Sequence, residues 1–198
     1  MTVYIASMNL RGKWAERPDN ALLLNVTSAQ GKTNKNRLAF SPMTETGYRG
    51  YYNFEAFWQS GKVYKDIPEE KTKQFWKAVK QPKRRYPGSK GKTVLYSKWE
   101  HTDKLDYVSS RKKVYVPLYY DMVKDEKQIS FWKEQLSNGN DIVIYDFDGP
   151  RLDDGSVTCL KVTRKLLQEK INDTRFPFGH GYVVAMLLKD ISLQKIVG

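Results

Sequence analysis

The chain has 198 residues, 40% of them hydrophobic and 13% aromatic, which excludes a disordered tail and predicts one folded domain over 1–198. Its formal net charge is +12, from 34 Lys and Arg against 22 Asp and Glu. Such an excess favours polyanionic partners, most often nucleic acid, although an ordinary basic protein would show it too.

Cys159 is the single cysteine, so the sequence excludes a disulfide framework and a thiolate metal cluster. No apolar segment approaches the length of a membrane span, and no secretory leader pattern opens the sequence. We therefore expect a soluble, cytoplasmic protein with no membrane partner. We also expect a monomer that uses neither a metal nor an organic cofactor.

Two short strands are predicted near the start of the chain, at Val3–Ala6 and Leu22–Val26, because both segments are apolar and of β type. The polar residues 28–37 that follow are predicted to form a loop. Polar loops of this length within a compact domain are more often functional than idle.

A helix is predicted from Asn53, a favourable N-cap, to Lys62. Within it, Glu55, Gln59 and Lys62 recur at i, i+4 and i+7, which places a carboxylate, an amide and an amine on one face. Trp58 and other aromatic residues occupy the adjoining face and can pack on a core. The row is a candidate site. Its alternative is a solvated surface on which Glu55 simply complements the helix dipole.

A second helix is predicted over 69–80, after a proline suited to a helix start. From Lys71 to Trp99 there is no acidic residue, and a glycine-containing loop is predicted at 83–92. Its spacing does not match the phosphate-binding P-loop, so we predict non-specific phosphate contact, with a solvated basic face as the alternative. The residues assigned to this contact are Lys83, Arg84, Arg85, Lys90 and Lys92.

The second half of the chain alternates between helical and strand patterns. Helices are predicted at 130–136 and 162–171, and the clearest strand of the sequence is Asp141–Tyr145. A last helix, Gly181–Leu188, is apolar nearly all round and should be central and buried. His180, which precedes it between two glycines, is expected to be structural. These elements predict an α+β fold, mainly helical, with a few short strands.

The strand at 141–145 leads into Asp146-Phe147-Asp148-Gly149, which resembles the first motif of haloacid-dehalogenase-type phosphatases. That assignment is rejected because proline follows the glycine where threonine is expected, and because only 49 residues remain for the other motifs. A cation site fails the EF-hand spacing, so a capped, ligand-facing loop is the preferred interpretation. The carboxylates that such a cation would need are those of Asp146, Asp148, Asp153 and Asp154.

Five segments spread over residues 40–190 occur in an order that is familiar from one family. They are Phe40-Ser41-Pro42, Glu55–Lys62, Trp99-Glu100, Tyr145–Gly149 and Gly181-Tyr182. In this order they resemble the Phe-Ser loop, the signature helix, the Trp-Glu step, the Tyr-Trp-Gly-Asp-Gly loop and the Leu-Gly-Tyr-Leu-Leu ending of the NADAR (YbiA-like) superfamily. In its detailed residues the sequence resembles members from tailed phages and large DNA viruses more than the bacterial members.

The resemblance implies a hydrolase of N-glycosidic bonds that removes ADP-ribose from guanine in DNA, in preference to RNA. In a phage or virus, such an enzyme would reverse a host defence that ADP-ribosylates the viral genome, and it would work in the host cytoplasm. Glu55 would serve as general acid/base or stabilise positive charge on the ribosyl carbon. Lys62 would donate a proton or attack the opened sugar as an amine.

The same resemblance implies the residues that hold the substrate. Asp148 and Gly149 would hold the ribose, Trp58 would stack on a base, and Asn53 and Gln59 would complete the site. The family's Trp and Gly in the Asp148 loop are Asp146 and Phe147 in this chain, so the contacts of that loop stay open. Two alternatives also stay open: a non-catalytic basic protein that binds nucleic acid, and an N-glycosidase acting on a free nucleotide-like metabolite.

Overall fold

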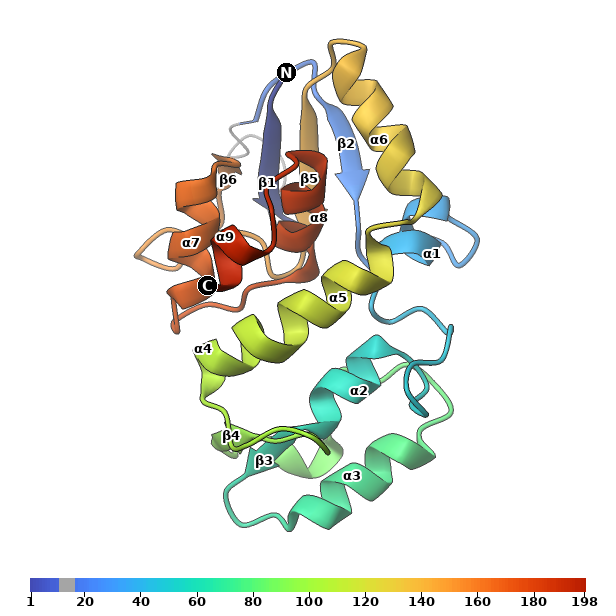
Figure 1. The fold of residues 1–198 in the computed structure, drawn as a ribbon, viewed down its shortest axis with the longest axis vertical. Helices are drawn as coiled ribbons and strands as arrows, with labels where there is room; N and C mark the ends of the chain where they lie inside the picture. The colour runs from blue at the N-terminus through green and yellow to red at the C-terminus, as the bar shows by residue number, and fades with distance from the viewer. Residues whose placement is uncertain (11–16) are drawn as a thin grey trace. The chain divides into compact units, whose positions relative to one another are not determined.

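The computed structural model describes residues 1–10 and 17–198, which form an α+β chain (Figure 1). Two compact units divide it: Met1–Ser41 together with Val116–Gly198 make the first, and Pro42–Tyr115 make the second. A single domain over 1–198 stays a prediction, since two compact units can belong to one domain. Among the helices of the described residues, none is long and apolar enough to cross a membrane.

The first unit is built on a four-stranded sheet in the order β2-β5-β1-β6. The inner strands β1 and β5 are parallel, with Val3 opposite Ile142 and Ser7 opposite Asp146. Strand β2 is parallel to β5, whereas β6 is antiparallel to β1. The three strands predicted from the sequence are confirmed: the apolar runs of β1 and β5 are buried in this sheet, whereas β2 at its edge buries only Leu24. Their bounds are β1 (Val3–Ser7), β2 (Leu22–Asn25), β5 (Ile142–Asp146) and β6 (Cys159–Lys161).

Helix α8 (His180–Leu188) lies against strands β1 and β5 of this sheet (Figure 1). Every one of its residues is buried, which confirms the prediction of a central apolar helix. Burying each large aliphatic side chain of such a helix contributes about 1.5–3 kcal/mol to folding. The other helices of this unit are α1 (Lys35–Phe40), α5 (Val116–Val123), α6 (Lys127–Ser137), α7 (Arg164–Asn172) and α9 (Gln194–Val197).

Capping residues shift two predicted boundaries in the first unit. The polar loop predicted over 28–37 is wrong at its end, because α1 begins at Lys35. Asn34 caps this helix, and its side-chain oxygen accepts a hydrogen bond from the Arg37 amide at 3.1 Å. Helix α7 similarly begins after Thr163, whose hydroxyl accepts from the amide of Leu166 at 3.1 Å.

The second unit pairs a two-stranded antiparallel sheet with helices. Helix α3 packs against α2 and β3, and its Trp76 is fully buried beside Ala56 and Val79. The bounds in this unit are α2 (Phe54–Ser60), β3 (Lys62–Tyr64), α3 (Glu69–Ala78), a 3-10 turn (Pro87–Ser89), β4 (Val94–Ser97), α4 (Tyr107–Ser110) and a π-helix (Arg111–Tyr115).

Tyr119 in α5 links folding of the first unit to pH. Its fully buried hydroxyl donates a hydrogen bond to the Phe40 carbonyl at 2.5 Å. Burial raises the pKa of Tyr119 well above its ordinary value, and the charges of Asp146 and Glu126 raise it further. Above pH ~10 the unfolded chain therefore releases this phenolic proton while the folded chain retains it. Stability contributed by neutral Tyr119 is complete below that pH and is lost as the pH rises further.

We predict that Tyr119→Phe makes the free energy of unfolding depend less steeply on pH in the alkaline range. At neutral pH the variant should lose about 1 kcal/mol, because the Phe40 carbonyl loses its donor. Above pH ~10 the free energy of unfolding of the variant should fall less steeply than that of the wild type. Urea unfolding of both proteins across this range measures the two slopes, and parallel slopes would contradict the prediction.

Candidate active site

The N-terminus of α2 is set by Asn53, whose side chain is almost completely buried. Its oxygen accepts a hydrogen bond from the Ala56 amide at 2.8 Å, and its amide donates to the Met43 carbonyl at 3.0 Å. The same turn is anchored a second time, since the Glu55 amide donates to the Pro42 carbonyl at 2.9 Å. These hydrogen bonds of Asn53 position the first turn of α2 and, with it, Glu55. Its substrate contact stays a prediction.

Glu55 and Gln59 are brought together as the helical spacing predicted. The Gln59 Nε2 donates a hydrogen bond of 2.7 Å to the Glu55 Oε1. Gln59 is buried and Glu55 is half-buried, so the amide orients the carboxylate while leaving part of it open to solvent. A positioned and partly accessible carboxylate is what acid–base chemistry requires.

Lys62 does not lie on the helix, and its predicted alignment at i+7 is wrong. Helix α2 ends at Ser60, Gly61 is its C-cap, and Lys62 is the first residue of β3. Strand pairing holds Lys62 outside the helix: Lys62 lies opposite Ser97 in the β3–β4 pair, and the Lys98 amide donates to the Gly61 carbonyl at 2.7 Å. The Trp99 ring packs so closely on Gly61 that a Cβ there would lie 2.1 Å from the Trp99 Cε2. Lys62 nevertheless stays near the helix, because its ammonium lies over the ring of Trp58, 5.8 Å from the centroid.

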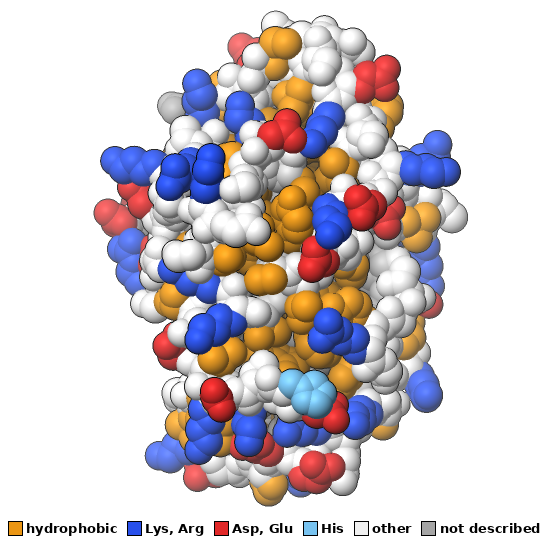
Figure 2. Space-filling view, viewed as in Figure 1, with side chains coloured by type: hydrophobic (Ala, Val, Ile, Leu, Met, Phe, Trp, Pro, Cys, Tyr) orange, Lys and Arg blue, Asp and Glu red, His pale blue; other side chains and the backbone are white. Residues whose placement is uncertain are grey.

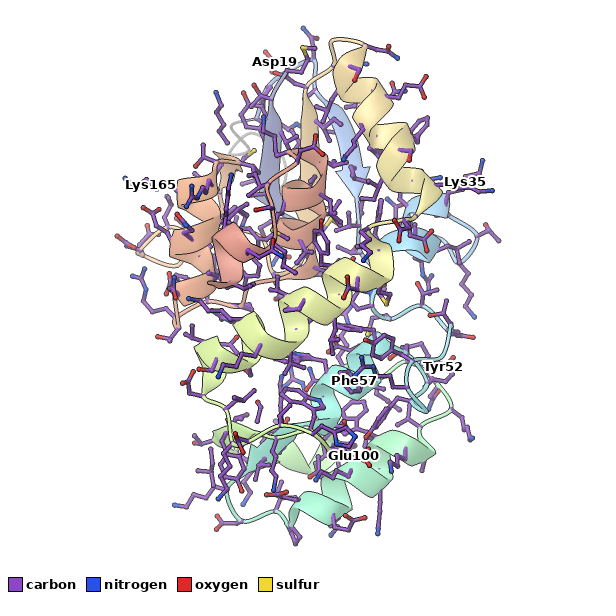
Figure 3. The ribbon with its side chains drawn as sticks, in the orientation of Figure 1. Asp19, Lys35, Tyr52, Phe57, Glu100 and Lys165 are labelled. Carbon is purple, nitrogen blue, oxygen red and sulfur yellow. The ribbon has the colours of Figure 1, made fainter. Side chains whose placement is uncertain are left out.

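Trp58 belongs to an aromatic cluster beside this carboxylate. It stacks on Trp99 with 5.2 Å between centroids and 18° between planes, and it meets Tyr115 at 4.9 Å. The Trp99 indole N–H donates at 3.0 Å to the carbonyl of Phe57, a residue of α2 that is labelled in Figure 3. Trp58 is 8% exposed, so it forms a wall of the site more than an open platform. Base stacking on it stays a prediction.

Tyr64, at the end of β3, is a site neighbour that the sequence analysis missed. Burial raises the pKa of Tyr64, while Ser89 and the positive charge of Arg85 oppose that rise and the charge of Glu55 adds to it. The Tyr64 hydroxyl therefore lies within electrostatic reach of both Glu55 and Arg85. The available signal is the β-branched and aromatic pair Val63-Tyr64 directly after the helix, since both residue types are enriched in strands.

Asp148 and Gly149 belong to the first unit, whereas Glu55 and Lys62 belong to the second. Asp148 is exposed and Gly149 is buried. A Cβ on Gly149 would lie 2.5 Å from the backbone oxygen of Ala6 in β1. Close packing against a strand thus explains this glycine without a ligand, and its role with a ribose stays a prediction.

Asp146 explains the glycines on both sides of His180. Its Oδ2 accepts a hydrogen bond from the Gly181 amide at 2.7 Å and lies 3.4 Å from the His180 Nδ1. A Cβ on Gly179 would lie 2.3 Å from the same oxygen, and one on Gly181 would lie 2.8 Å from the Asp146 Cβ. The His180 Nε2 donates to the Val26 carbonyl at 3.0 Å. These contacts support a structural histidine at a capped helix start.

The predicted phosphate-contacting residues gather after α3 and are largely accessible. Lys83 is half-buried, and the other four are exposed. Lys92 lies 3.7 Å from the Asp66 carboxylate, an exposed ion pair that contributes little to stability. Figure 2 shows Lys and Arg side chains spread over the visible face, with fewer Asp and Glu among them. Salt-sensitive contact with a polyanion fits this surface.

The second unit thus holds a carboxylate oriented by an amide on α2, and an ammonium and a phenol on the strand that follows the helix. These groups can donate, accept and shuttle protons beside an aromatic wall. Within residues 1–10 and 17–198, no group of three or more His, Cys, Asp or Glu side chains could hold a metal ion. No protein-family model matches the chain, and neither the curated proteins nor the solved structures give a match.

Proposed function

We propose that the chain is a NADAR-like N-glycosidase that removes ADP-ribose from guanine bases in DNA. The observation that carries the proposal is the half-buried Glu55 carboxylate, oriented by the 2.7 Å hydrogen bond from Gln59. Lys62 and Tyr64 follow α2 on β3, and the charges of Glu55 and Arg85 both act on the pKa of Tyr64. A phage or viral protein of this kind would restore a genome that the host has modified.

Hydrolysis breaks the bond between the anomeric carbon of the ribose and a guanine nitrogen, and water supplies the new C–O bond. The leaving nitrogen takes a proton, and the ribosyl carbon becomes positive in the transition state. Glu55 stabilises that positive carbon and accepts a proton from the attacking water. Lys62, as an ammonium, donates a proton to the leaving base. Glu55 then releases to the solvent the proton that it took from water, and Lys62 takes one back, so both groups return to their starting states. ADP-ribose and unmodified guanine are the products.

DNA is the favoured carrier of the modified base because of the residues between Lys71 and Trp99. This segment holds no Asp or Glu, and its Arg84, Arg85 and Lys90 are exposed. Cations of this kind contact phosphates and release counterions, so binding should weaken steeply with salt. Turnover at low substrate concentration should fall with salt in parallel.

The test is incubation of the purified protein with an oligonucleotide that carries ADP-ribose on a single guanine. We expect release of free ADP-ribose and recovery of the unmodified oligonucleotide, both followed by mass spectrometry. An otherwise identical oligonucleotide without ADP-ribose controls for cleavage of ordinary glycosidic bonds. Absence of release from the modified strand would contradict the proposed substrate.

A second candidate is a non-catalytic protein that binds nucleic acid, favoured by the same exposed basic residues. It predicts salt-sensitive DNA binding that is unaffected by Glu55→Gln, together with no release of ADP-ribose. A third, hydrolysis of a free nucleotide-like metabolite, predicts that neutralising Lys83, Arg84 and Arg85 leaves turnover unchanged. The oligonucleotide assay separates the first candidate from the other two, and turnover of a free ADP-ribosylated guanine nucleoside separates the second from the third.

A further inference from the structure

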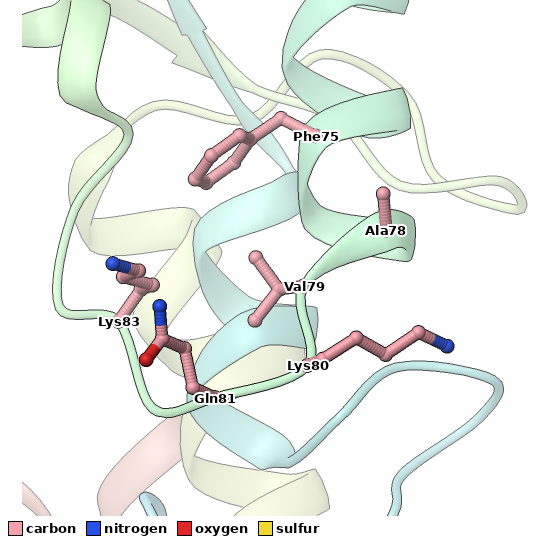
Figure 4. A pocket seen from close by; sticks show the side chains of 6 residues that line it. All are labelled: Phe75, Ala78, Val79, Lys80, Gln81 and Lys83. Atoms are coloured by element: carbon pink, nitrogen blue, oxygen red, sulfur yellow. The ribbon is translucent and has the colours of Figure 1, made fainter.

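A pocket of about 510 Å³ opens at the C-terminal end of α3, within the second unit. Its size falls in the range of small-molecule sites, which run from ~300 to ~1,000 Å³. Apolar side chains make its floor, and two lysines with an amide stand at its edge (Figure 4). The residues that line it are Phe75, Ala78, Val79, Lys80, Gln81 and Lys83.

Phe75 presents a fixed aromatic ring to this pocket (Figure 4). It meets Trp76 at 5.1 Å and Tyr86 at 5.0 Å, both in edge-to-face geometry. The two neighbours are buried members of one hydrophobic cluster with Val79, so the ring is held from behind while its own side chain stays half-buried. A rigid, partly exposed ring is a suitable surface for stacking a planar group.

The positive charge around the pocket indicates that the planar group it binds carries negative charge nearby. Lys80 and Lys83 flank the apolar floor, and among the described residues neither forms an ion pair with a carboxylate. No acidic residue occurs from Lys71 to Trp99. The exposed amide of Gln81 lies between the two lysines and can both donate and accept hydrogen bonds. The aromatic floor suits the face of a nucleic-acid base, and the amide suits the hydrogen-bonding edge of that base. The lysines suit the phosphates on either side of it.

We propose that this pocket binds an unpaired base of single-stranded DNA. In a duplex the bases are paired and stacked on each other, so none could enter a pocket floored by Phe75 and Val79. A single strand presents bases that can stack on an aromatic side chain while lysines contact the backbone. The pocket requires neither Glu55 nor ADP-ribose. It therefore goes beyond the proposed hydrolysis and can be tested on unmodified DNA.

The experiment measures binding of a fluorescent oligothymidylate and of a duplex of equal length by anisotropy, at several salt concentrations. We expect tighter binding of the single strand. Phe75→Leu should weaken that binding roughly five- to a hundredfold and leave duplex binding unchanged, because base stacking is lost. Phe75→Tyr keeps a stacking surface and should bind as the wild type does. Phe131→Leu, which removes an exposed ring in α6 of the first unit, is the matched control.

The lysines are tested separately with surface variants that leave the apolar floor intact. The double variant Lys80→Gln with Lys83→Gln should weaken single-strand binding and lower the salt slope by about one per lost phosphate contact. Lys35→Gln, an exposed lysine of α1 in the first unit, matches the change in charge per site. Equal affinity for single strand and duplex would overturn the proposal. Unchanged single-strand binding by a folded Phe75→Leu would overturn it as well.

Discussion

Replacing Glu55 with glutamine is expected to slow release of ADP-ribose by about 10²- to 10⁴-fold, the usual contribution of one acid–base group. Glutamine has nearly the same shape and keeps an oxygen that can accept the 2.7 Å hydrogen bond from Gln59. It cannot carry the negative charge that stabilises a positive ribosyl carbon, nor take a proton from water. The loss should therefore appear in the chemical step, measured by single-turnover release from the modified oligonucleotide.

The chain offers a closely matched control in Glu70 of α3. The Gln74 Nε2 donates to the Glu70 Oε1 at 3.2 Å, the same i, i+4 arrangement on an exposed helix surface. Glu70→Gln changes charge and hydrogen bonding alike but lies outside the proposed site, so it should release ADP-ribose at the wild-type rate. Full activity of Glu55→Gln would remove the catalytic role assigned to this carboxylate. Equal losses in both variants would show a general effect of charge.

The central elements of the first unit could be predicted from the sequence, because they are continuous apolar segments. Strands at Val3–Ser7 and Ile142–Asp146 and the helix His180–Leu188 are buried almost throughout, and uninterrupted hydrophobic segments need no partner to be recognised. Boundaries were harder, because side chains such as those of Asn34 and Thr163 compete to cap a helix. The α+β class is accordingly established, whereas a NADAR-type arrangement stays a proposal.

Within the candidate site, the spacing of residues predicted correctly the contact that lies within one helix. Glu55 and Gln59 pair across one helical turn, which periodicity alone predicts. Lys62 was misplaced because it pairs with Ser97 of β4, a residue distant in sequence, and so belongs to a strand. The influence of Arg85 on Tyr64 was likewise invisible, since it joins a loop to a strand through the fold. Contacts between residues that are distant in the sequence cannot be predicted from the spacing of residues in one sequence.

Gly149 was assigned to ligand binding from the sequence, whereas its long-range contact is with a strand. Replacing it is the second change from which we expect a large effect. Gly149→Ala should destabilise the first unit by about 3 kcal/mol, the upper end of the usual cost of overpacking. The added Cβ would lie 2.5 Å from the oxygen of Ala6, 2.6 Å from its carbonyl carbon and 2.6 Å from the Ser7 Cα. All three atoms belong to the backbone of β1, which is held between β5 and β6 and cannot yield as a flexible side chain would.

Gly31→Ala is the matched control, because a Cβ at that position meets no atom within 4 Å and the residue does not have a positive φ. Its stability should change by less than about 1 kcal/mol, with a slight gain from the stiffer unfolded chain. Urea unfolding of both variants gives the comparison. If Gly149→Ala were as stable as the wild type yet slow in releasing ADP-ribose, the glycine would act through the substrate. A large loss of stability assigns it to packing on β1, and the resemblance of the Asp148 loop to a ribose-binding loop would then rest on Asp148 alone.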